Sequence, residues 1–184
     1  MMKRYKIIGA PAGTVPTLEM LHLLNGKGQL GSALSVVSDQ IDEDVYVYHT
    51  WNVANKSKAE QKEEYHKFKI YIENNRDKKI VFISTKSQKD TWYTHYKQMS
   101  EALLLTKCEK GVVIRLPTFI GKPSRVFLAQ DDVKTYGNME LISLEVAANK
   151  IVEICGKKTK LKIVEVEGET VSAYLVREIV KATK

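Results

Sequence analysis

The chain alternates short apolar runs with longer amphipathic stretches, and this alternation constrains the fold more than any other feature. The apolar runs are expected to be strands, at 20–24, 45–49, 79–84, 111–116 and 161–166. The stretches with apolar residues at helical spacing are expected to be helices, at 29–39, 57–75, 91–106, 144–155 and 173–181. Strands that alternate with helices are typical of parallel sheets. The sequence therefore predicts an α/β fold, with a doubly wound parallel sheet in a three-layer sandwich.

The first 19 residues leave two interpretations open. In one, 5–8 is an additional strand of the sheet and 20–24 is the strand that leads into the first long helix. In the other, a helix runs over 14–24 and 33–37 is a strand. We favour the first, because the link between 33–37 and the strand at 45–49 is too short for a parallel crossover, which needs a dozen or more residues.

Composition excludes some classes of protein. The chain has 184 residues, 43% of them hydrophobic and 28% charged, so we expect one globular domain over 1–184. Its net charge of +7 comes mostly from lysines scattered among glutamates, which is not the arginine-rich stripe of a nucleic-acid binder. No apolar run reaches the ~20 residues of a membrane span, and two cysteines cannot form a disulfide framework. We expect a cytoplasmic protein with no metal site, since the histidines lack metal-ligand spacing.

A glycine-rich loop precedes the first long helix and fits the pattern G-x-G-x-x-G. Such glycines allow a tight turn, close approach of the backbone to a pyrophosphate, and close packing of helix on strand. The helix that follows presents free N–H groups to the phosphates. The residues expected to hold a dinucleotide here are Gly26, Gly28, Gln29, Leu30 and Gly31.

The residues after the next strand leave the choice of dinucleotide open. An acidic residue that binds the ribose usually follows the glycine loop by ~20 residues, at a strand tip. Here the strand at 45–49 is followed by Thr50-Trp51-Asn52, with no carboxylate, so NAD and NADP are both retained. We expect Trp51 to pack in the core or at its rim, with stacking on a ligand ring as the alternative.

A tyrosine and a lysine stand one helical turn apart in the expected helix at 91–106. Tyr93, Lys97 and Glu101 form one stripe, offset from the apolar positions that include Tyr96. We therefore expect this stripe to lie away from the core, where Lys97 and Glu101 can form a surface ion pair.

The same spacing also permits proton-transfer chemistry. A lysine one turn from a tyrosine favours the phenolate and lowers the pKa of the phenol. Tyr93 could then move a proton to or from a substrate oxygen while a dinucleotide moves a hydride. A hydroxyl at the tip of the preceding strand, Ser84 or Thr85, would hydrogen-bond the same oxygen.

Five motifs occur in a fixed order along the chain. They are the glycine loop at 26–31, the strand D-V-Y-V-Y-H at 44–49, Ile83-Ser84-Thr85, Tyr93-x-x-x-Lys97-x-x-x-Glu101, and I-R-L-P-T-F-I-G at 114–121. In this order they resemble the extended short-chain dehydrogenases/reductases, which include nucleotide-sugar epimerases, dehydratases and 4-keto-sugar reductases. The resemblance spans roughly residues 20–182.

The resemblance implies a Rossmann-like fold and roles for individual residues. It makes Tyr93 the acid/base, Lys97 the ribose-binding residue that lowers the tyrosine pKa, and Thr85 or Ser84 the substrate-orienting hydroxyl. It further implies cofactor contacts from His49, Pro117 and Thr118. The function that it implies is an NAD(P)-dependent oxidoreductase or epimerase-type enzyme, acting on a hydroxyl or keto group of a nucleotide sugar.

The chain also departs from this family's pattern. Two strand–helix units that normally follow the first helix are missing, and the substrate-binding region is reduced to little more than 122–140. A non-catalytic NAD(P)- or nucleotide-binding regulatory protein is therefore the alternative expectation. The small substrate region also suggests a homodimer, in which a second subunit completes the site.

Overall fold

The computed structural model describes residues 29–37, 39, 45–120, 134, 136–156 and 162–182. Several predicted features lie outside this part of the chain: the strands at 5–8 and 20–24, the alternative helix over 14–24, Gly26 and Gly28, and most of the region 122–140. No helix among the described residues is both long enough and apolar enough to cross a membrane.

A parallel four-stranded sheet forms the centre of the described fold. Its spatial order is β1-β2-β3-β6, with the bounds β1 (Val45–Tyr48), β2 (Lys79–Thr85), β3 (Val112–Leu116) and β6 (Ile163–Glu165). β2 pairs in parallel with β1 and β3, and β3 pairs in parallel with β6. The four strands predicted for this part of the chain are confirmed, with small differences at their ends.

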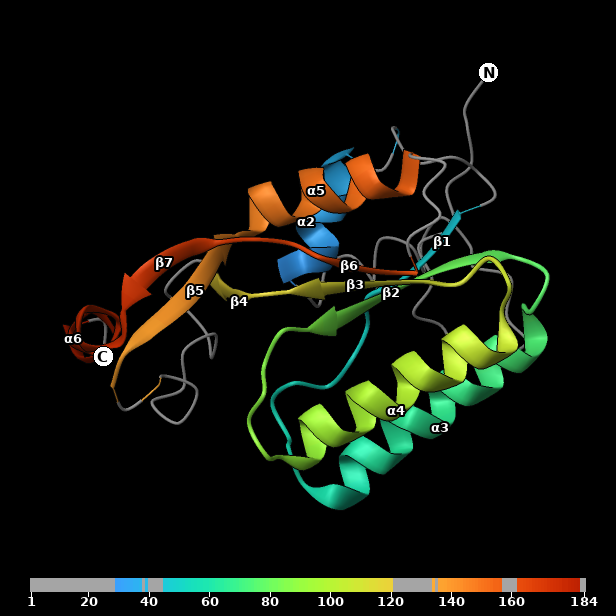
Figure 1. Cartoon of the computed structure of the whole chain (residues 1–184), viewed down its shortest axis with the longest axis horizontal. Helices are drawn as coiled ribbons and strands as arrows, with labels where there is room; N and C mark the ends of the chain where they lie inside the picture. The colour runs from blue at the N-terminus through green and yellow to red at the C-terminus, as the bar shows by residue number, and fades with distance from the viewer. Residues whose placement is uncertain are drawn as a thin grey trace.

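Helices cover both faces of this sheet and produce three layers (Figure 1). α3 (Lys58–Asn74) and α4 (Trp92–Lys107) lie on one face, whereas α2 (Gln29–Val37) and α5 (Leu144–Gly156) lie on the other. The predicted three-layer α/β sandwich is confirmed. The alternative strand at 33–37 is wrong, because this segment belongs to α2.

The strands are apolar on both faces because both faces are covered by helices. In β2, Ile80 and Phe82 belong to the core under α3 and α4, while Val81 and Ile83 belong to the core under α2 and α5. The α3–α4 core is rich in aromatic rings, and Phe68 of α3 stacks on Phe82 with ring centroids 4.4 Å apart.

Side-chain caps fix where α3 and α4 begin. The Ser57 hydroxyl accepts a hydrogen bond from the Glu60 N–H at 3.4 Å, and the Thr91 hydroxyl accepts one from the Thr94 N–H at 3.2 Å. Such caps satisfy backbone donors that a helix leaves free at its first turn. The starts expected at 57 and 91 are therefore confirmed as capping positions.

A second, three-stranded sheet was not predicted from the sequence. It has the order β4-β5-β7, with the bounds β4 (Thr118–Ile120), β5 (Asn138–Ser143) and β7 (Glu169–Ser172). β5 pairs in parallel with β4 and antiparallel with β7. All three strands are short, so none of them forms a long apolar run that would predict a strand. β5 also begins inside the segment expected to be a remnant substrate region.

The second sheet is held by a small core and by one close backbone approach. Met139 and Leu141 of β5 pack on Ala173 and Val176 of α6 (Ala173–Ala182). Gly168 lies so close to β5 that an added Cβ would stand 2.3 Å from the Leu141 carbonyl oxygen. Only glycine fits this position without a shift of the backbone.

We expect Phe68→Ala to destabilise the protein by about 3–4 kcal/mol, because it removes a fully buried ring and leaves a cavity against Phe82. Ile70→Ala on the same helix is the control, since Ile70 is half exposed. Urea unfolding curves of the two variants provide the measurement. Equal losses would contradict the placement of Phe68 in the core.

Candidate functional site

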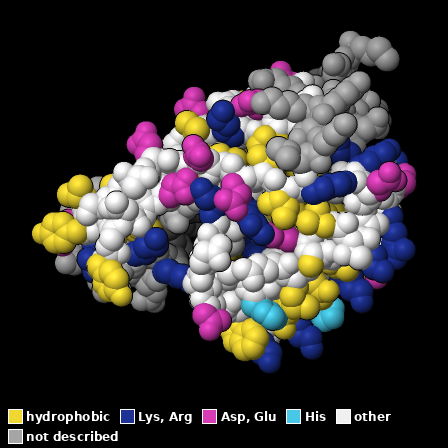
Figure 2. All heavy atoms as spheres, in the orientation of Figure 1, with side chains coloured by type: hydrophobic (Ala, Val, Ile, Leu, Met, Phe, Trp, Pro, Cys, Tyr) yellow, Lys and Arg dark blue, Asp and Glu magenta, His cyan; other side chains and the backbone are white. Residues whose placement is uncertain are grey.

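The candidate site lies where the strands of the main sheet end at their carboxyl termini. His49 follows β1, Ser84 and Thr85 end β2, and Pro117 follows β3. α4 begins at this same edge, and the second sheet extends from it (Figure 1). In the space-filling view, a hollow lies between the lobe of the second sheet and the α3–α4 layer (Figure 2). Open parallel sheets bind their ligands at such an edge.

Lys97 is the central buried charge of the site. Its side chain projects from α4 toward β2, and only 4% of the residue is exposed. Nζ donates a hydrogen bond of 2.7 Å to the Ile83 carbonyl oxygen. It also lies 4.4 Å from the ring centroid of Trp51, 4.6 Å from that of Phe82 and 5.9 Å from that of Tyr93. Tyr93 and Lys97 are thus neighbours at the carboxyl end of β2.

Burial is the main influence on the charge of Lys97. Removal of the ammonium from water lowers its pKa to about 7, and the nearby carboxylates of Glu64 and Glu101 oppose this shift. The amine therefore titrates near neutral pH, where a small change in its surroundings changes its charge.

The stripe of Tyr93, Lys97 and Glu101 faces inward, which corrects the prediction that it lies away from the core. Lys97 and Glu101 are buried, whereas the apolar side chain of Met99 on the same helix is 38% exposed. α4 packs on both the sheet and α3, so its buried surface is wide, and Tyr96 covers the part next to Tyr65 of α3. The polar stripe occupies the side of the helix that packs on the sheet.

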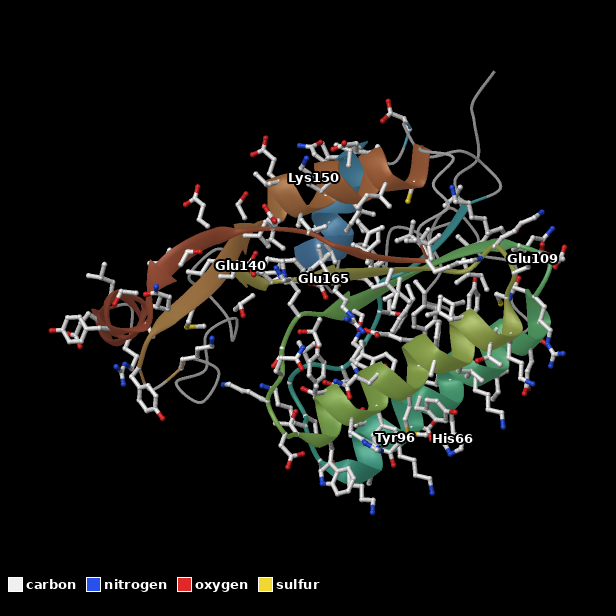
Figure 3. The ribbon with its side chains drawn as sticks, viewed as in Figure 1. His66, Tyr96, Glu109, Glu140, Lys150 and Glu165 are labelled. Carbon is white, nitrogen blue, oxygen red and sulfur yellow. The ribbon has the colours of Figure 1, made fainter. Side chains whose placement is uncertain are left out.

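Glu101 belongs to a polar network that joins α4 to two strands. Its carboxylate accepts a 2.5 Å hydrogen bond from Ser84 Oγ and a 2.6 Å bond from Arg115 Nη2, with Arg115 Nε also within 3.2 Å. Arg115 Nη1 lies 3.1 Å from Glu165 of β6, which is labelled in Figure 3. The bonds to Glu101 raise the pKa of Arg115 further above its ordinary value. Lys97 and Glu101 therefore do not form the surface ion pair considered above.

The two strand-tip hydroxyls face opposite sides of the sheet. Ser84 follows Phe82 on the α3–α4 face, and its hydroxyl donates to Glu101. Thr85 follows Ile83 on the other face, and its hydroxyl accepts a 3.0 Å bond from the Ser87 N–H. Ser84 therefore shares a face with Tyr93 but is already bonded to a carboxylate.

His49 carries a buried nitrogen without a partner. Its Nε2 atom makes no hydrogen bond within the described part of the protein. Burial and the nearby Lys97 charge lower its pKa to about 4, so the ring is neutral at neutral pH. A buried polar atom without a partner is uncommon, and a bound hydroxyl or amide would satisfy it.

The loop after β1 is fastened to α3 by a set of hydrogen bonds that the sequence did not reveal. Trp51 Nε1 donates to Gln61 Oε1 at 2.7 Å, and the fully buried Gln61 donates in turn to the carbonyls of Asn52 and Asn55. Glu64 Oε2 accepts a 3.3 Å bond from the Asn52 N–H. These bonds hold the Trp51 ring over Lys97. The packing alternative expected for Trp51 is the one observed.

The second sheet is joined to the same edge by an ion pair. Lys86, just beyond β2, donates to Glu140 of β5 at 2.5 Å, and the other carboxylate oxygen of Glu140 accepts from the Gly168 N–H at 2.7 Å. Burial raises the pKa of Glu140, but these two bonds outweigh it and the pKa is lowered. Pro117 and Thr118 lie where the chain passes from the main sheet into the second sheet.

Of the expected dinucleotide loop, the structure describes only the end. Gln29 begins α2, and Leu30 packs against the main core, while Gly26 and Gly28 lie outside the described residues. Among the described residues, no group of three or more His, Cys, Asp or Glu side chains is placed to hold a metal.

We expect Arg115→Met to destabilise the protein by about 3 kcal/mol, because it leaves the buried Glu101 carboxylate without its cation. Glu165→Gln removes the exposed partner of the same arginine and should cost less than about 1 kcal/mol. Urea unfolding compares the two variants. An Arg115→Met loss as small as that of Glu165→Gln would rule out a stabilising role for the buried pair.

We expect His49 to make the protein less stable as the pH falls from about 6.5 to 4. In this window the unfolded chain binds a proton at His49 and the folded chain does not, so acid favours unfolding. The contribution is on the order of 2 kcal/mol, and His49→Gln should flatten the pH dependence of the unfolding free energy. His66→Gln, at an exposed position on α3, should leave it unchanged; a slope that is the same in all three proteins would contradict the burial of His49.

No family model and no curated protein match this chain. Solved structures do share its fold. A dTDP-4-dehydrorhamnose reductase from Clostridium acetobutylicum superposes with a TM-score of 0.62 at 13% identity, over 85% of this chain and 77% of that one. A UDP-N-acetylglucosamine 4-epimerase from Bacillus cereus gives 0.56 at 14% identity, over 84% and 69%.

An NAD-dependent NDP-hexosamine 5,6-dehydratase of tunicamycin biosynthesis gives a TM-score of 0.54 at 14% identity, over 79% of this chain. The alignment covers only 62% of that dehydratase, so this chain spans less than two thirds of its length. At such identities the similarity establishes the fold alone. The parallel sheet with helices on both faces is the Rossmann-like fold expected from the sequence.

Proposed function

We propose that the protein is an NAD(P)-dependent enzyme of the oxidoreductase or epimerase type, which transfers a hydride and a proton at a hydroxyl or keto group. The observation that carries this proposal is the placement of Tyr93 beside Lys97 at the carboxyl edge of a Rossmann-like sheet. Dinucleotides bind at this edge in such folds. The structures that share the fold include a reductase, an epimerase and a dehydratase of nucleotide sugars, which supports a nucleotide sugar as substrate.

The fit to a dinucleotide rests on the unpartnered Nε2 of His49, a buried polar atom at the end of β1. The groups that would hold the dinucleotide are the start of α2 at Gln29, Leu30 and Gly31, together with His49, Lys97, Pro117 and Thr118. When bound, it would supply or accept the hydride. NAD and NADP are both retained, and measurement of the affinity for each distinguishes between them.

In this proposal Tyr93 gives a proton to the substrate oxygen, or takes one from it. The Lys97 amine lies 5.9 Å from the centroid of the tyrosine ring, and in its protonated form it stabilises negative charge on the phenol oxygen. Ser84, on the same face of the sheet, or Thr85, at the end of β2, orients the substrate oxygen. Glu101 and Arg115 hold the α4 helix on the sheet and so keep the tyrosine at the strand ends.

The second candidate is a nucleotide-binding protein that performs no hydride transfer. The covering of Lys97 favours it, because Nζ is bonded to the Ile83 carbonyl and lies under the Trp51 ring. To bind a ribose hydroxyl, this amine would have to use an N–H other than the one that it donates to the Ile83 carbonyl. The two candidates differ in turnover and not in dinucleotide binding.

We expect Tyr93→Phe to lower turnover by at least ~100-fold while dinucleotide affinity changes less than about twofold, because only the proton-transferring hydroxyl is removed. Turnover is followed by the absorbance of the reduced nicotinamide with nucleotide 4-keto-sugars as substrates, and affinity by fluorescence titration.

Tyr96→Phe is the matched control, one turn away on the buried face next to Tyr65, and should retain turnover. Persistent turnover in Tyr93→Phe would overturn the acid/base role. Absence of NAD(H) and NADP(H) binding at millimolar concentration would overturn the cofactor proposal. Dinucleotide binding with no turnover of any nucleotide sugar would support the second candidate.

A further inference from the structure

We infer that the Trp51 ring seals the Lys97 amine, so that this amine acts through its charge and donates no hydrogen bond to a bound ribose. Trp51 is in this respect a positioning residue, and Gln61 of α3, which holds its ring, is a second. The resemblance to extended short-chain dehydrogenases/reductases implies the reverse, a lysine that binds the ribose directly. For the step at Tyr93 the inference rests on the proposed function, whereas the sealing of the amine can be tested without any dinucleotide.

The hydrogen-bonding capacity of the Lys97 amine is taken up by protein groups. An ammonium carries three N–H donors. One is donated to the Ile83 carbonyl at 2.7 Å, and Nζ lies over two aromatic rings, 4.4 Å from the Trp51 centroid and 4.6 Å from that of Phe82. These three contacts equal the three donors in number, and only 4% of Lys97 is exposed. A ligand hydroxyl would therefore have to replace one of the protein groups.

Two of these three groups belong to the central sheet and cannot move aside. Ile83 and Phe82 are residues of β2, and Phe82 is fully buried against Phe68 of α3. Trp51 instead follows β1, before α3 begins. The sealing of the amine therefore depends on whether this loop holds its ring in place.

Gln61 fixes the loop at three points. Its Oε1 atom accepts the Trp51 indole N–H at 2.7 Å, and its Nε2 atom donates to the carbonyls of Asn52 and Asn55 at 2.7 and 2.6 Å. Because the Gln61 side chain is fully buried, a displaced loop would leave its amide without these partners, which is unfavourable. The Trp51 ring also meets Phe82 edge-on, with centroids 5.8 Å apart. Trp51 is thus built into the core and is not a mobile lid.

The seal determines how Lys97 can contribute to proton transfer. Nζ lies 5.9 Å from the centroid of the Tyr93 ring, and the amine is surrounded by protein rather than by water. Charges interact more strongly in such surroundings than in water. The protonated amine therefore favours the phenolate of Tyr93 by its charge, and any attraction that it has for a dinucleotide is electrostatic as well.

The first test measures access to the Lys97 amine in the protein without ligand. Acetic anhydride at limiting concentration modifies accessible amines, and peptide mass spectrometry gives the rate at each lysine. In the wild type, Lys97 should be acetylated much more slowly than Lys107, an exposed lysine of the same helix. Gln61→Met removes the three bonds that hold the loop and should raise the Lys97 rate at least ~5-fold relative to that of Lys107.

Gln98→Met is the matched control, because it makes the same substitution at an exposed glutamine next to Lys97 in the sequence. It should leave the Lys97 rate unchanged. A wild-type Lys97 rate equal to that of Lys107, or a Gln61→Met rate equal to that of the wild type, overturns the inference.

A second variant keeps the test decisive if Gln61→Met does not fold. Trp51→Phe retains an aromatic ring but removes the N–H that Gln61 accepts, so it should also raise the Lys97 rate. Trp92→Phe is its matched control, at the other of the two tryptophans, which is 43% exposed, and should not. A Trp51→Phe rate no higher than that of Trp92→Phe overturns the inference.

A double-mutant cycle tests the absence of a bond to the ribose. NAD⁺ and NADP⁺ are each compared with the analogue whose nicotinamide ribose lacks its hydroxyls, by fluorescence titration of the wild type and of Lys97→Met. Without such a bond, the substitution changes the affinities for dinucleotide and analogue by the same factor, within about twofold. A clearly larger loss for the dinucleotide than for its analogue shows a direct bond and overturns the inference.

These measurements separate the inference from the proposed function. A protected Lys97 that becomes accessible in Gln61→Met, in a protein that binds neither dinucleotide, supports the seal and refutes the proposed function. In an active enzyme, Gln61→Met should lower kcat at least about fivefold, because water weakens the action of the amine on Tyr93, and Gln98→Met should retain it. An accessible amine with an unchanged kcat overturns the positioning role.

Discussion

The arrangement at the carboxyl edge of the sheet depends on burying one lysine amine. An ammonium removed from water needs hydrogen-bond acceptors, ring faces or carboxylates close to it. Lys97 obtains these from four different segments: the Ile83 carbonyl of β2, the Trp51 ring after β1, Glu64 of α3 and Glu101 of its own helix. The Ile83 carbonyl and the Trp51 ring contact the amine directly, so α4, β2 and the loop after β1 meet at this point.

The two faces of the sheet are consequently built in different ways. Under α2 and α5, the core is formed by aliphatic side chains with few aromatic groups. Under α3 and α4, Phe82 stacks on Phe68 and also lies near the buried Lys97 amine, and Glu101 forms its polar network on the same face. A buried polar group that loses its partner costs stability, so the bonds of Lys97 and Glu101 specify the position of α4 more narrowly than apolar contacts do. Lysine, arginine and acidic side chains are interspersed over the outer surface of this layer (Figure 2).

The sequence predicts the parallel sheet and its helices well, because apolar runs and helical spacing are local signals. It misplaces the Tyr93–Lys97–Glu101 stripe, because buried charges find partners elsewhere in the chain. Lys97 donates to the Ile83 carbonyl, and Glu101 accepts from Ser84 and Arg115. The pairing of Glu101 with Arg115 spans 14 positions along the chain, and the Lys86–Glu140 pair spans 54, so no local pattern contains them. The second sheet is not predicted for the same reason, because its short strands pair with segments that are distant in the sequence.

The second sheet bounds the candidate site on one side. β4 leaves the main sheet directly after Pro117, which lacks an N–H and cannot continue a strand ladder. The Lys86–Glu140 pair and the close approach at Gly168 then fix the new sheet beyond the carboxyl ends of β2 and β3. A ligand at this edge would therefore have protein on two sides, the strand ends below it and the second sheet beside it.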